Sequence, residues 1–402
     1  MKKYIFIFIF GISAVVFSQK TDDYNTQTLS LYLKEDWKTL INIAEEAHEK
    51  NITSYEIDYR LAIAYYNTKN YFDSAQQFES IIKKYQTKDE TILEYLFYSY
   101  LYSGRHQDAL LISKDFPFHI KEKTGVTSFK FFDFLNAEGG VKISDKEDLG
   151  IENLKYINGG FGQQFGYRIK LQHAFTSLSQ NYIDFDYTQK EYYGKIQIQV
   201  AQGLTLIPAF HYINTIENNQ VTRIGNGPNI IISEQTDIKT QLFHFAIKKQ
   251  WNRFSISPNF IYYSLKNSDL GTLTKIQYGL TMGQTIKTTG DKLWIGAGGE
   301  FISSNTETNF VWNAKALYSI SPKTYLYIKY LNANTSDFAI ENAMYYYNST
   351  SVLVDNFSAT FGYYFTPKFS WYLNYQFENS KDLDYDLSFT YNTIITGIKI
   401  NF

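Results

Sequence analysis

The chain has 402 residues, a formal net charge of -2 and no cysteine. This length allows two or three domains, the near-neutral charge excludes a general nucleic-acid binder, and the missing cysteines exclude disulfides, thiolate metal sites and catalytic thiols. Tyr (36) and Phe (32) are abundant whereas Pro (6) is scarce, and this balance favours β-strands over disorder.

The N-terminus has the pattern of a secretory signal peptide. Lys2 and Lys3 precede an apolar run at 4–17, YIFIFIFGISAVVF. This run is shorter than the roughly 20 residues that a membrane-spanning helix needs. A signal peptide over residues 1–18 is therefore predicted, with an uncleaved membrane anchor as the alternative. We expect the mature protein to be exported.

Residues 21–117 have helical periodicity. Leu93, Leu96, Phe97 and Tyr100 recur at intervals of three and four residues, which places them along one face of a helix. A longer repeat aligns three stretches, and their spacing matches the period of a helical-hairpin array. The stretches are KEDWKTL (34–40), KNYFDSA (69–75) and SGRHQDA (103–109).

This segment resembles the tetratricopeptide repeat family. The family's close helix contact uses Leu and Tyr on the first helix, Gly at the turn and Ala on the second helix, and Leu96, Tyr100, Gly104 and Ala109 have these identities. Small residues are needed there because antiparallel helices approach closely only where side chains are short. The resemblance implies a docking surface on the concave face of the array.

Three residues are candidates for such a docking groove. Glu94, Tyr98 and Tyr102 are spaced by four residues and share one helical face. The alternative is that both tyrosines pack on the neighbouring helix. If they line a groove, the partner we expect is a periplasmic protein or a polysaccharide.

From residue 126 to 402 the periodicity changes to two. In FSWYLNYQFEN (369–379), large apolar and aromatic residues alternate with mostly polar ones, as in a strand with one apolar face. Tight turns alternate with longer connections, of which 216–237 and 331–355 are the longest. This pattern is typical of transmembrane β-barrels, which satisfy every backbone polar group by closing the sheet.

About fourteen alternating segments can be counted in this region, with a range of about twelve to sixteen. An even number places both barrel ends on one side of the membrane, where the helical domain would also lie. Trp251, Trp294, Trp312 and Trp371 are near strand ends and suit interfacial aromatic girdles. The predicted fold class is a multidomain α+β protein: tetratricopeptide-like helical hairpins over 21–117 and a transmembrane antiparallel barrel over 126–402.

The chain ends in an alternating strand, TIITGIKINF (393–402). Ile394, Ile398 and Ile400 would face lipid together with Phe402, and the strand should pair with the first strand near 126–141 to remove both sheet edges. A terminal aromatic residue resembles the signal that the barrel insertion machinery reads. We therefore interpret Phe402 as an insertion signal.

The whole chain resembles Gram-negative outer-membrane β-barrels that carry N-terminal tetratricopeptide repeats, a layout common in Bacteroidota. It is similar to YaiO-like barrels and, more distantly, to exopolysaccharide export porins with longer repeat arrays. The resemblance implies a place in the cell outer membrane with the N-terminal domain in the periplasm. Outer-membrane lipid and the insertion machinery are the implied partners.

No catalytic or metal motif stands out. The six histidines form no HExxH or His-x-His spacing, so no metal and no cofactor is predicted. The glycines of GGFGQQFG (159–166) are interpreted as sites of close approach within a strand. His173 with Ser177, or His211 with Ser255 or Ser257, could form a Ser-His pair of an outer-membrane lipid-modifying enzyme, but nothing in the sequence selects them and no enzyme is predicted.

A set of basic residues has the parity of the barrel lumen or lies at the start of a strand. We propose from the sequence that they make the lumen weakly cationic and favour small or anionic solutes. The alternative is that they pair with Glu300, Glu378 and other acidic residues to brace a closed interior. The set consists of Arg168, Lys170, Lys195, Lys315, Lys329 and Lys399.

Two function classes remain open at this point. The protein is either a transport or export pore whose repeat domain recruits a partner, or a barrel that only anchors a repeat scaffold. A repeat array this short disfavours a dedicated polymer exporter. The substrate is not assigned by the sequence.

Overall fold

The computed structural model describes residues 20–126, 131–146, 153–181, 185–223, 230–268, 271–288, 292–304, 307–382 and 386–402. The predicted signal peptide lies outside these ranges. The chain divides into a helical unit and a barrel unit, and each is described by itself below.

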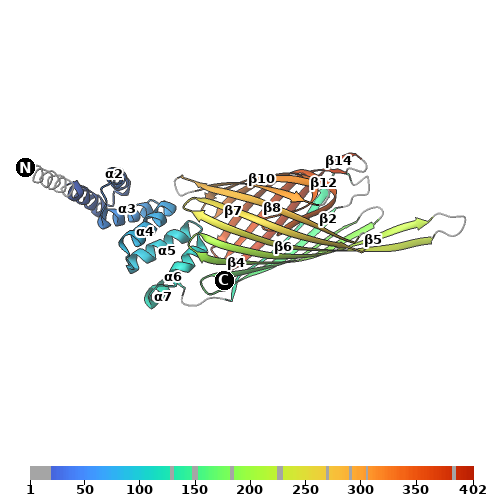
Figure 1. The fold of residues 1–402 in the computed structure, drawn as a ribbon, viewed down its shortest axis with the longest axis horizontal. Coiled ribbons are helices and arrows are strands. Elements are labelled where there is room, and N and C mark those ends of the chain that lie inside the picture. Colours follow the sequence, from blue (N-terminus) through green and yellow to red (C-terminus); the bar gives the residue numbers. More distant parts are fainter. Residues whose placement is uncertain are drawn as a thin grey trace, which may run out of the picture. The chain divides into compact units, whose positions relative to one another are not determined.

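The helical unit is a series of short helices. Helical backbone covers residues 20–33, and six further helices follow before the barrel begins. They are α2 (Trp37–Glu49), α3 (Tyr55–Asn67), α4 (Tyr71–Tyr85), α5 (Glu90–Tyr102), α6 (His106–Ser113) and α7 (Phe118–Thr124) (Figure 1). None of the helices in the described residues is both long and apolar enough to cross a membrane.

The helix starts follow the repeat seen in the sequence. The three aligned stretches of the repeat lead into α2, α4 and α6. Leu96, Tyr100 and Ala109 are buried where α5 meets α6, and Gly104 takes the left-handed backbone conformation in the turn between them, which glycine adopts without steric cost. The α-helical pairs are thus observed, and their assignment to the tetratricopeptide family stays a prediction.

A buried carboxylate ties three helices together. Asp58 on α3 accepts hydrogen bonds from His48 Nε2 at 2.7 Å, Lys84 Nζ at 3.0 Å and Tyr85 Oη at 2.9 Å. Burial raises the pKa of Asp58, but these hydrogen bonds outweigh it and hold the pKa below its ordinary value. The ionised carboxylate therefore stabilises the packing of α2, α3 and α4.

The barrel unit is a closed antiparallel sheet of 14 strands, in which each strand pairs with its sequence neighbours and β1 pairs with β14 (Figure 1). The predicted fold class is confirmed. The strands are β1 (Phe132–Ser144), β2 (Leu154–Phe165), β3 (Ile169–Asn181), β4 (Phe185–Ala201), β5 (Leu204–Arg223), β6 (Ile230–Trp251), β7 (Phe254–Asn267), β8 (Gly271–Ile286), β9 (Leu293–Ser303), β10 (Thr308–Ser321), β11 (Thr324–Ile340), β12 (Tyr345–Thr366), β13 (Phe369–Asp382) and β14 (Leu387–Asn401).

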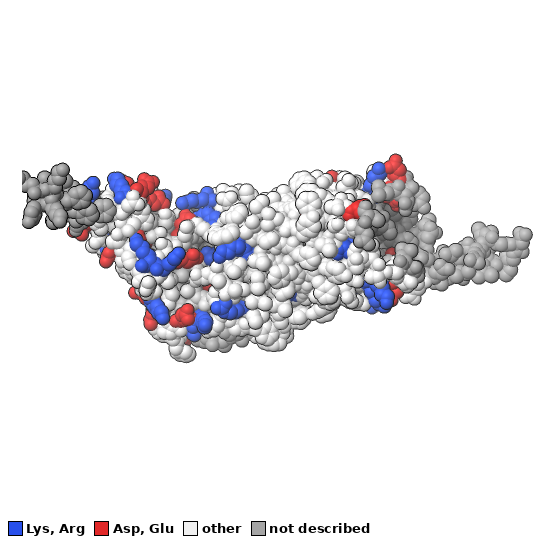
Figure 2. Space-filling model, in the orientation of Figure 1, with Lys and Arg blue, Asp and Glu red and all other residues white. Residues whose placement is uncertain are grey.

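The outer surface of the barrel is apolar. Alternate residues of the strands expose large hydrophobic side chains, and Figure 2 shows a band nearly free of charge between charged residues toward the two ends of the strands. Exposing so continuous an apolar surface to water would be unfavourable, whereas a transmembrane barrel needs an apolar outer band to face the lipid. This is an outer-membrane type of β-barrel. Exposed members of the band include Leu135, Phe175, Phe243, Phe245, Phe260, Tyr278, Phe310, Phe357, Leu373 and Ile398.

The seam of the barrel lies where the chain ends. β1 and β14 pair from Phe134 opposite Asn401 to Ser144 opposite Tyr391. The backbone N–H of Phe402 donates to the carbonyl oxygen of Asp133 at 3.1 Å, and its ring is exposed on the outside. The last residue is therefore held in the sheet, because closure removes the edge that both terminal strands would otherwise present.

Both rims of the barrel can be defined from the strands. We call the rim where β1 begins and β14 ends the terminal rim, and the opposite one the distal rim. At the distal rim β5 and β6 continue as a paired ribbon through the predicted loop 216–237, up to Arg223 opposite Ile230 (Figure 1). The long loop predicted over 216–237 was wrong for the paired residues. Two antiparallel strands can pair their backbone groups with each other beyond the membrane without an apolar face, so the alternation used for the prediction does not detect them.

One predicted girdle residue lies inside the barrel. The ring of Trp294 covers Gly283 and Gly296, whose missing side chains would point to the lumen, whereas Trp251 and Trp312 are exposed. The two glycines leave room for an indole that a Cβ atom would displace. Trp294 is therefore not part of an outer aromatic belt.

Candidate functional site

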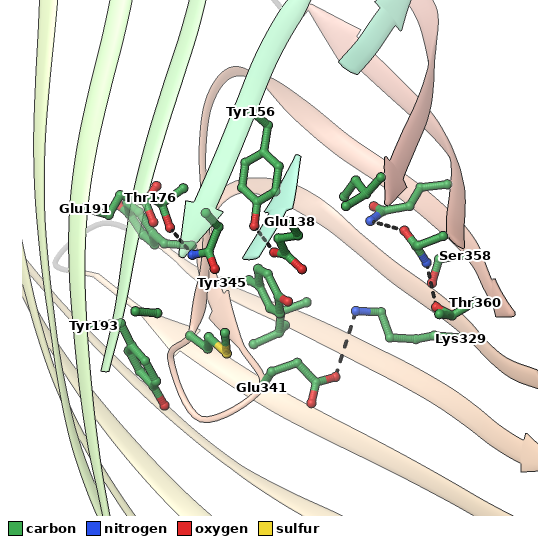
Figure 3. A pocket seen from close by; sticks show the side chains of 18 of the residues that line it. Glu138, Tyr156, Thr176, Glu191, Tyr193, Lys329, Glu341, Tyr345, Ser358 and Thr360 are labelled. Atoms are coloured by element: carbon green, nitrogen blue, oxygen red, sulfur yellow. Dashed lines mark hydrogen bonds and ion pairs between the residues drawn. The ribbon is translucent and has the colours of Figure 1, made fainter. Parts of the chain in front are cut away.

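The second long connection, 331–355, folds into the barrel. Its paired core runs from Asp337 opposite Asn348 to Ile340 opposite Tyr345 and ends in the turn 341–344. We call residues 337–348 the inserted hairpin. It contacts β4, β5, β7 and β8, which are not its neighbours in the sheet, so it must cross the lumen (Figure 3).

Ala339, on the first arm of the hairpin, is held by two wall side chains. Its N–H donates to Tyr263 Oη at 2.9 Å and to Gln277 Oε1 at 3.2 Å, and its carbonyl accepts from Gln277 Nε2 at 2.7 Å. Tyr263, Gln277 and Ala339 are all buried. Because a buried backbone group without a partner is costly, these two wall residues stabilise the inserted position.

The turn of the hairpin is held by β4 and β5. Tyr193 Oη donates to the Asn342 carbonyl at 3.0 Å. His211 Nδ1 lies 2.8 Å from the Ala343 carbonyl and its Nε2 lies 3.1 Å from Glu191 Oε2. A carbonyl only accepts hydrogen bonds, so Nδ1 of this fully buried histidine is the donor to the hairpin.

The turn has an unfavourable backbone conformation. Glu341, Asn342 and Ala343 have φ values of 56°, 61° and 62°, a region that costs non-glycine residues about 1 kcal/mol or more each. Each of the three also contacts the wall. The wall contacts therefore maintain a turn that the chain would not adopt alone.

Ion pairs between the hairpin and the wall add to these contacts. Glu341 Oε1 lies 2.7 Å from Lys315 Nζ and 3.9 Å from Lys329 Nζ. Asp337 Oδ2 lies 2.9 Å from Lys275 Nζ. Both acidic residues of the hairpin are thus paired with lysines of β8, β10 and β11.

The hairpin leaves a cavity of about 560 Å³ on the other side of the lumen. The cavity is lined by β1–β4, β11–β14 and the hairpin itself, and its walls are rich in tyrosine hydroxyls and rings (Figure 3). Such a surface can pack against an apolar body and also form hydrogen bonds. The tyrosines are Tyr156, Tyr193, Tyr325, Tyr327, Tyr345, Tyr346, Tyr347 and Tyr372.

A second cavity, of about 230 Å³, continues toward the distal rim. It reaches Lys142, Glu217 and Tyr391, which lie in the distal halves of β1, β5 and β14. The first cavity extends to Tyr325, beside the start of β11 at the terminal rim. The two adjoin along one side of the lumen, because both are lined by Tyr156, Leu178, Tyr345, Tyr346, Tyr347, Gln376 and Ile395.

Glu138 is one of three glutamates that line the larger cavity. It accepts hydrogen bonds from the hydroxyls of Tyr156 and Tyr372. Tyr372 reaches it by crossing Gly397, since a Cβ atom at Gly397 would lie 2.4 Å from the tyrosine ring. This carboxylate is therefore bonded to two tyrosine hydroxyl groups of the wall, and Figure 3 shows the bond from Tyr156.

The structure brings three of the predicted lumen residues together and places three elsewhere. Lys195, Lys315 and Lys329 surround the turn of the hairpin. Lys170 pairs with Asp133, and Lys399 lies over the ring of Phe134 at 4.4 Å. Arg168 lies in the turn before β3 and donates to the carbonyls of Gln199 and Val200 at 2.9 and 2.6 Å.

The carboxylates that pair with these lysines are not the two that the sequence alternative named, Glu300 and Glu378. Lys315 and Lys329 pair with Glu341 of the hairpin. Glu378 pairs with Lys142, while Glu300 accepts hydrogen bonds from Gln277 and Asn259. The lysines therefore hold an inserted segment, which neither sequence alternative contained.

The candidate groove of the helical unit is partly occupied by its own contacts. Glu94 Oε1 pairs with Lys123 Nζ at 2.6 Å. Tyr98 and Tyr102 stack with ring centroids 6.0 Å apart, and Tyr102 also lies 4.9 Å from Tyr71 while remaining 53% exposed. These residues form one exposed tyrosine cluster, and its role as a groove stays a prediction.

The Ser-His pairs considered from the sequence are not brought together. His211 faces the lumen and is engaged by Glu191 and Ala343, and its strand β5 is separated from β7, which carries Ser255 and Ser257, by β6. His173 hydrogen-bonds to Tyr192 at 3.0 Å. Across the described ranges, no group of three or more His, Asp or Glu could hold a metal ion.

Sequence reasoning missed the residues that hold the hairpin. Alternation gives Tyr263 and Gln277 no role beyond that of strand residues, and it suggests His211 only for a Ser-His pair, because their partners in the hairpin lie 62 to 132 positions away. One signal was present: Tyr345, Tyr346 and Tyr347 form a run of aromatic residues in the long connection predicted over 331–355. Three adjacent tyrosines suit a segment with both faces covered.

No protein-family model and no curated protein matches the chain. Among solved structures, the CymD monoaromatic hydrocarbon channel matches with a TM-score of 0.47 and 8% identity over 68% of this chain and 89% of that one. The P. putida toluene transporter TodX matches with 0.44 and 9% over 67% and 90%. A Pseudomonas aeruginosa FadL homologue matches with 0.41 and 8% over 67% and 90%. Similarity at this level assigns neither a family nor a substrate.

Proposed function

We propose that the protein is a gated outer-membrane channel for small solutes, with the inserted hairpin as the gate. One observation carries this proposal: the hairpin is fixed to one side of the lumen while two adjoining cavities extend along the other side toward both rims. A barrel that served only as an anchor would need neither a strained turn nor a tyrosine-lined cavity beside it. Solutes would move along the side formed by β1–β4 and β12–β14.

The gate is tested by removing it. In one variant residues 337–348 are replaced by an Asn-Gly turn, which suits a two-residue hairpin connection. The matched control excises residues 220–233. Of these, 220–223 and 230–233 pair with each other in the distal ribbon of β5 and β6 and do not line either cavity. Single-channel conductance in planar bilayers should rise several-fold on removing the hairpin and should not change in the control.

Two results would overturn the gate. Equal conductance of the hairpin deletion and the wild type would show that the hairpin does not limit the path. Silence of both proteins, with heat-modifiable gel mobility confirming a folded barrel, would show that no path exists.

A docking role for the helical unit is a second proposal, favoured by the exposed tyrosine cluster around Tyr102. The expected partner is a periplasmic protein or a polysaccharide. A photo-crosslinking residue at position 102 should give a discrete adduct in intact cells, and the same residue at exposed Glu49 should not. Identical adduct patterns at both positions would contradict a specific groove at this cluster.

A further inference from the structure

The turn of the inserted hairpin lies within a group of wall lysines. Lys195 comes from β4, Lys315 from β10 and Lys329 from β11. Two of them share one oxygen of Glu341, Oε1, at 2.7 and 3.9 Å. Two ammonium groups from adjacent strands therefore share a single carboxylate of the gate, and the third, Lys195, lines the same cavity from β4.

The neighbouring carboxylates are engaged by other groups. Glu191 is bonded to His211, Glu138 to Tyr156 and Tyr372, and Glu300 to Gln277 and Asn259. This leaves Glu341 as the acidic partner of the lysine group.

Lys195 is the least satisfied member of the group. It lines the large cavity together with Lys329 and Glu341. Within the part of the chain that the structure describes, its ammonium has no hydrogen bond and no ion pair. Lys195 is partly buried, and removing an ammonium from part of its water without a counter-charge is unfavourable, so a carboxylate entering the cavity would be attracted to it.

The rest of the cavity indicates what such a carboxylate would be attached to. Tyr193, Tyr327, Tyr345 and Ile340 line the same space as Lys195 and Lys329. Flat apolar groups pack well against tyrosine rings. The volume of about 560 Å³ accommodates a single-ring compound.

We propose that the cavity binds small monocarboxylates with a flat apolar body, and that their carboxylate contacts Lys195 and Lys329. The bound carboxylate competes with Glu341 for Lys329, so Glu341 acts as an internal substitute that holds the gate when solute is absent. This inference rests on the proposed gate and names the class of solute that releases it. Removing the carboxylate of Glu341 should therefore strengthen solute binding.

The test is titration calorimetry on the purified full chain in neutral detergent. Phenylacetate is the probe, and phenylacetamide is the matched neutral control of the same shape. We expect phenylacetate to bind at least about tenfold more tightly, because one charge-assisted contact contributes about 1.5–3 kcal/mol, or a factor of ten per 1.4 kcal/mol. Equal affinity for the acid and the amide would overturn the proposal.

Three variants locate the site. Lys195→Met should weaken phenylacetate binding about tenfold, while Lys323→Met, in an exposed turn between β10 and β11, should leave it unchanged. Glu341→Gln should strengthen binding, because it removes the competing carboxylate while keeping the shape. Equal effects of the two lysine variants, or weaker binding by Glu341→Gln, would contradict the proposal.

The solute class and the gate can fail separately. If deletion of the hairpin raises conductance but the acid and the amide bind equally, the gate stands and the monocarboxylate assignment falls. If phenylacetate binds selectively through Lys195 but deletion of the hairpin leaves conductance unchanged, the binding site stands and the gate falls.

Discussion

Removal of a single hydroxyl group should loosen the gate. Tyr263 Oη accepts a hydrogen bond from the buried N–H of Ala339 at 2.9 Å, and Gln277 Oε1 is the other acceptor at 3.2 Å. In Tyr263→Phe only the longer hydrogen bond remains. Losing a buried neutral hydrogen bond costs about 1 kcal/mol, and somewhat more if the donor is left poorly satisfied. The ratio of open to closed time should therefore rise roughly five- to tenfold.

Single-channel recording in planar bilayers measures this ratio directly. The matched control is Tyr375→Phe, which also removes a tyrosine hydrogen bond, to Asn392 Oδ1 at 2.6 Å, but on the outer face of the barrel. The control should leave gating unchanged. Equal ratios in the two variants would refute the role of the Tyr263 hydroxyl, and a longer closed time in Tyr263→Phe would refute the direction of the argument.

Three further predictions concern the turn, the helical unit and the terminus. Ala343→Gly should lower the open-to-closed ratio several-fold in the same recordings, because glycine removes about 1 kcal/mol of left-handed strain from the inserted state. The pKa of Asp58 is lowered in the folded state, so its stabilisation is complete above the unfolded pKa of about 3.9 and is lost as pH falls through the folded pKa. Urea unfolding followed by helical circular dichroism should show this loss below about pH 4, and Asp58→Asn should be less stable at neutral pH with a flatter acid response. Deleting Phe402 should reduce the barrel yield in membrane fractions without changing the helical unit, and normal membrane levels would contradict its interpretation as an insertion signal.

The sequence predicted the wall of the barrel because the wall obeys a local rule. Each strand must present every second side chain to lipid, and that alternation is visible in stretches such as 369–379. Closure through β1 and β14 followed from the alternating C-terminus, since an unpaired edge would be unstable in lipid. The parity of Lys195, Lys315 and Lys329 followed from the same rule.

The contents of the lumen obey no such rule. The inserted hairpin pairs its own strands as any distal ribbon would, and the ribbon of β5 and β6 is paired in the same way yet extends beyond the rim. What distinguishes them is contact with residues far along the chain, such as Tyr193 and His211. A periodic pattern reports which face of a strand a residue occupies, but not which distant strand lies across the lumen from it.

The hairpin joins the barrel wall through an irregular stretch of the ladder between β11 and β12. Pairing of β11 and β12 is regular up to Asn332 opposite Asp355, and register shifts follow on both sides of Thr335. Asn334, with φ of 55°, lies in the first of these two irregular stretches, between Asn332 and Thr335. The ladder between β11 and β12 stays paired from Thr324 to Asn332. Rotation at the irregular stretch would therefore move the turn 341–344 out of the lumen while the backbone groups of the wall keep their partners. A gate hinged at this point would have to break its contacts across the lumen. Those contacts are supplied by Tyr193, His211, Tyr263 and Gln277, and by the apolar packing of Ala339 and Ala343 on the wall.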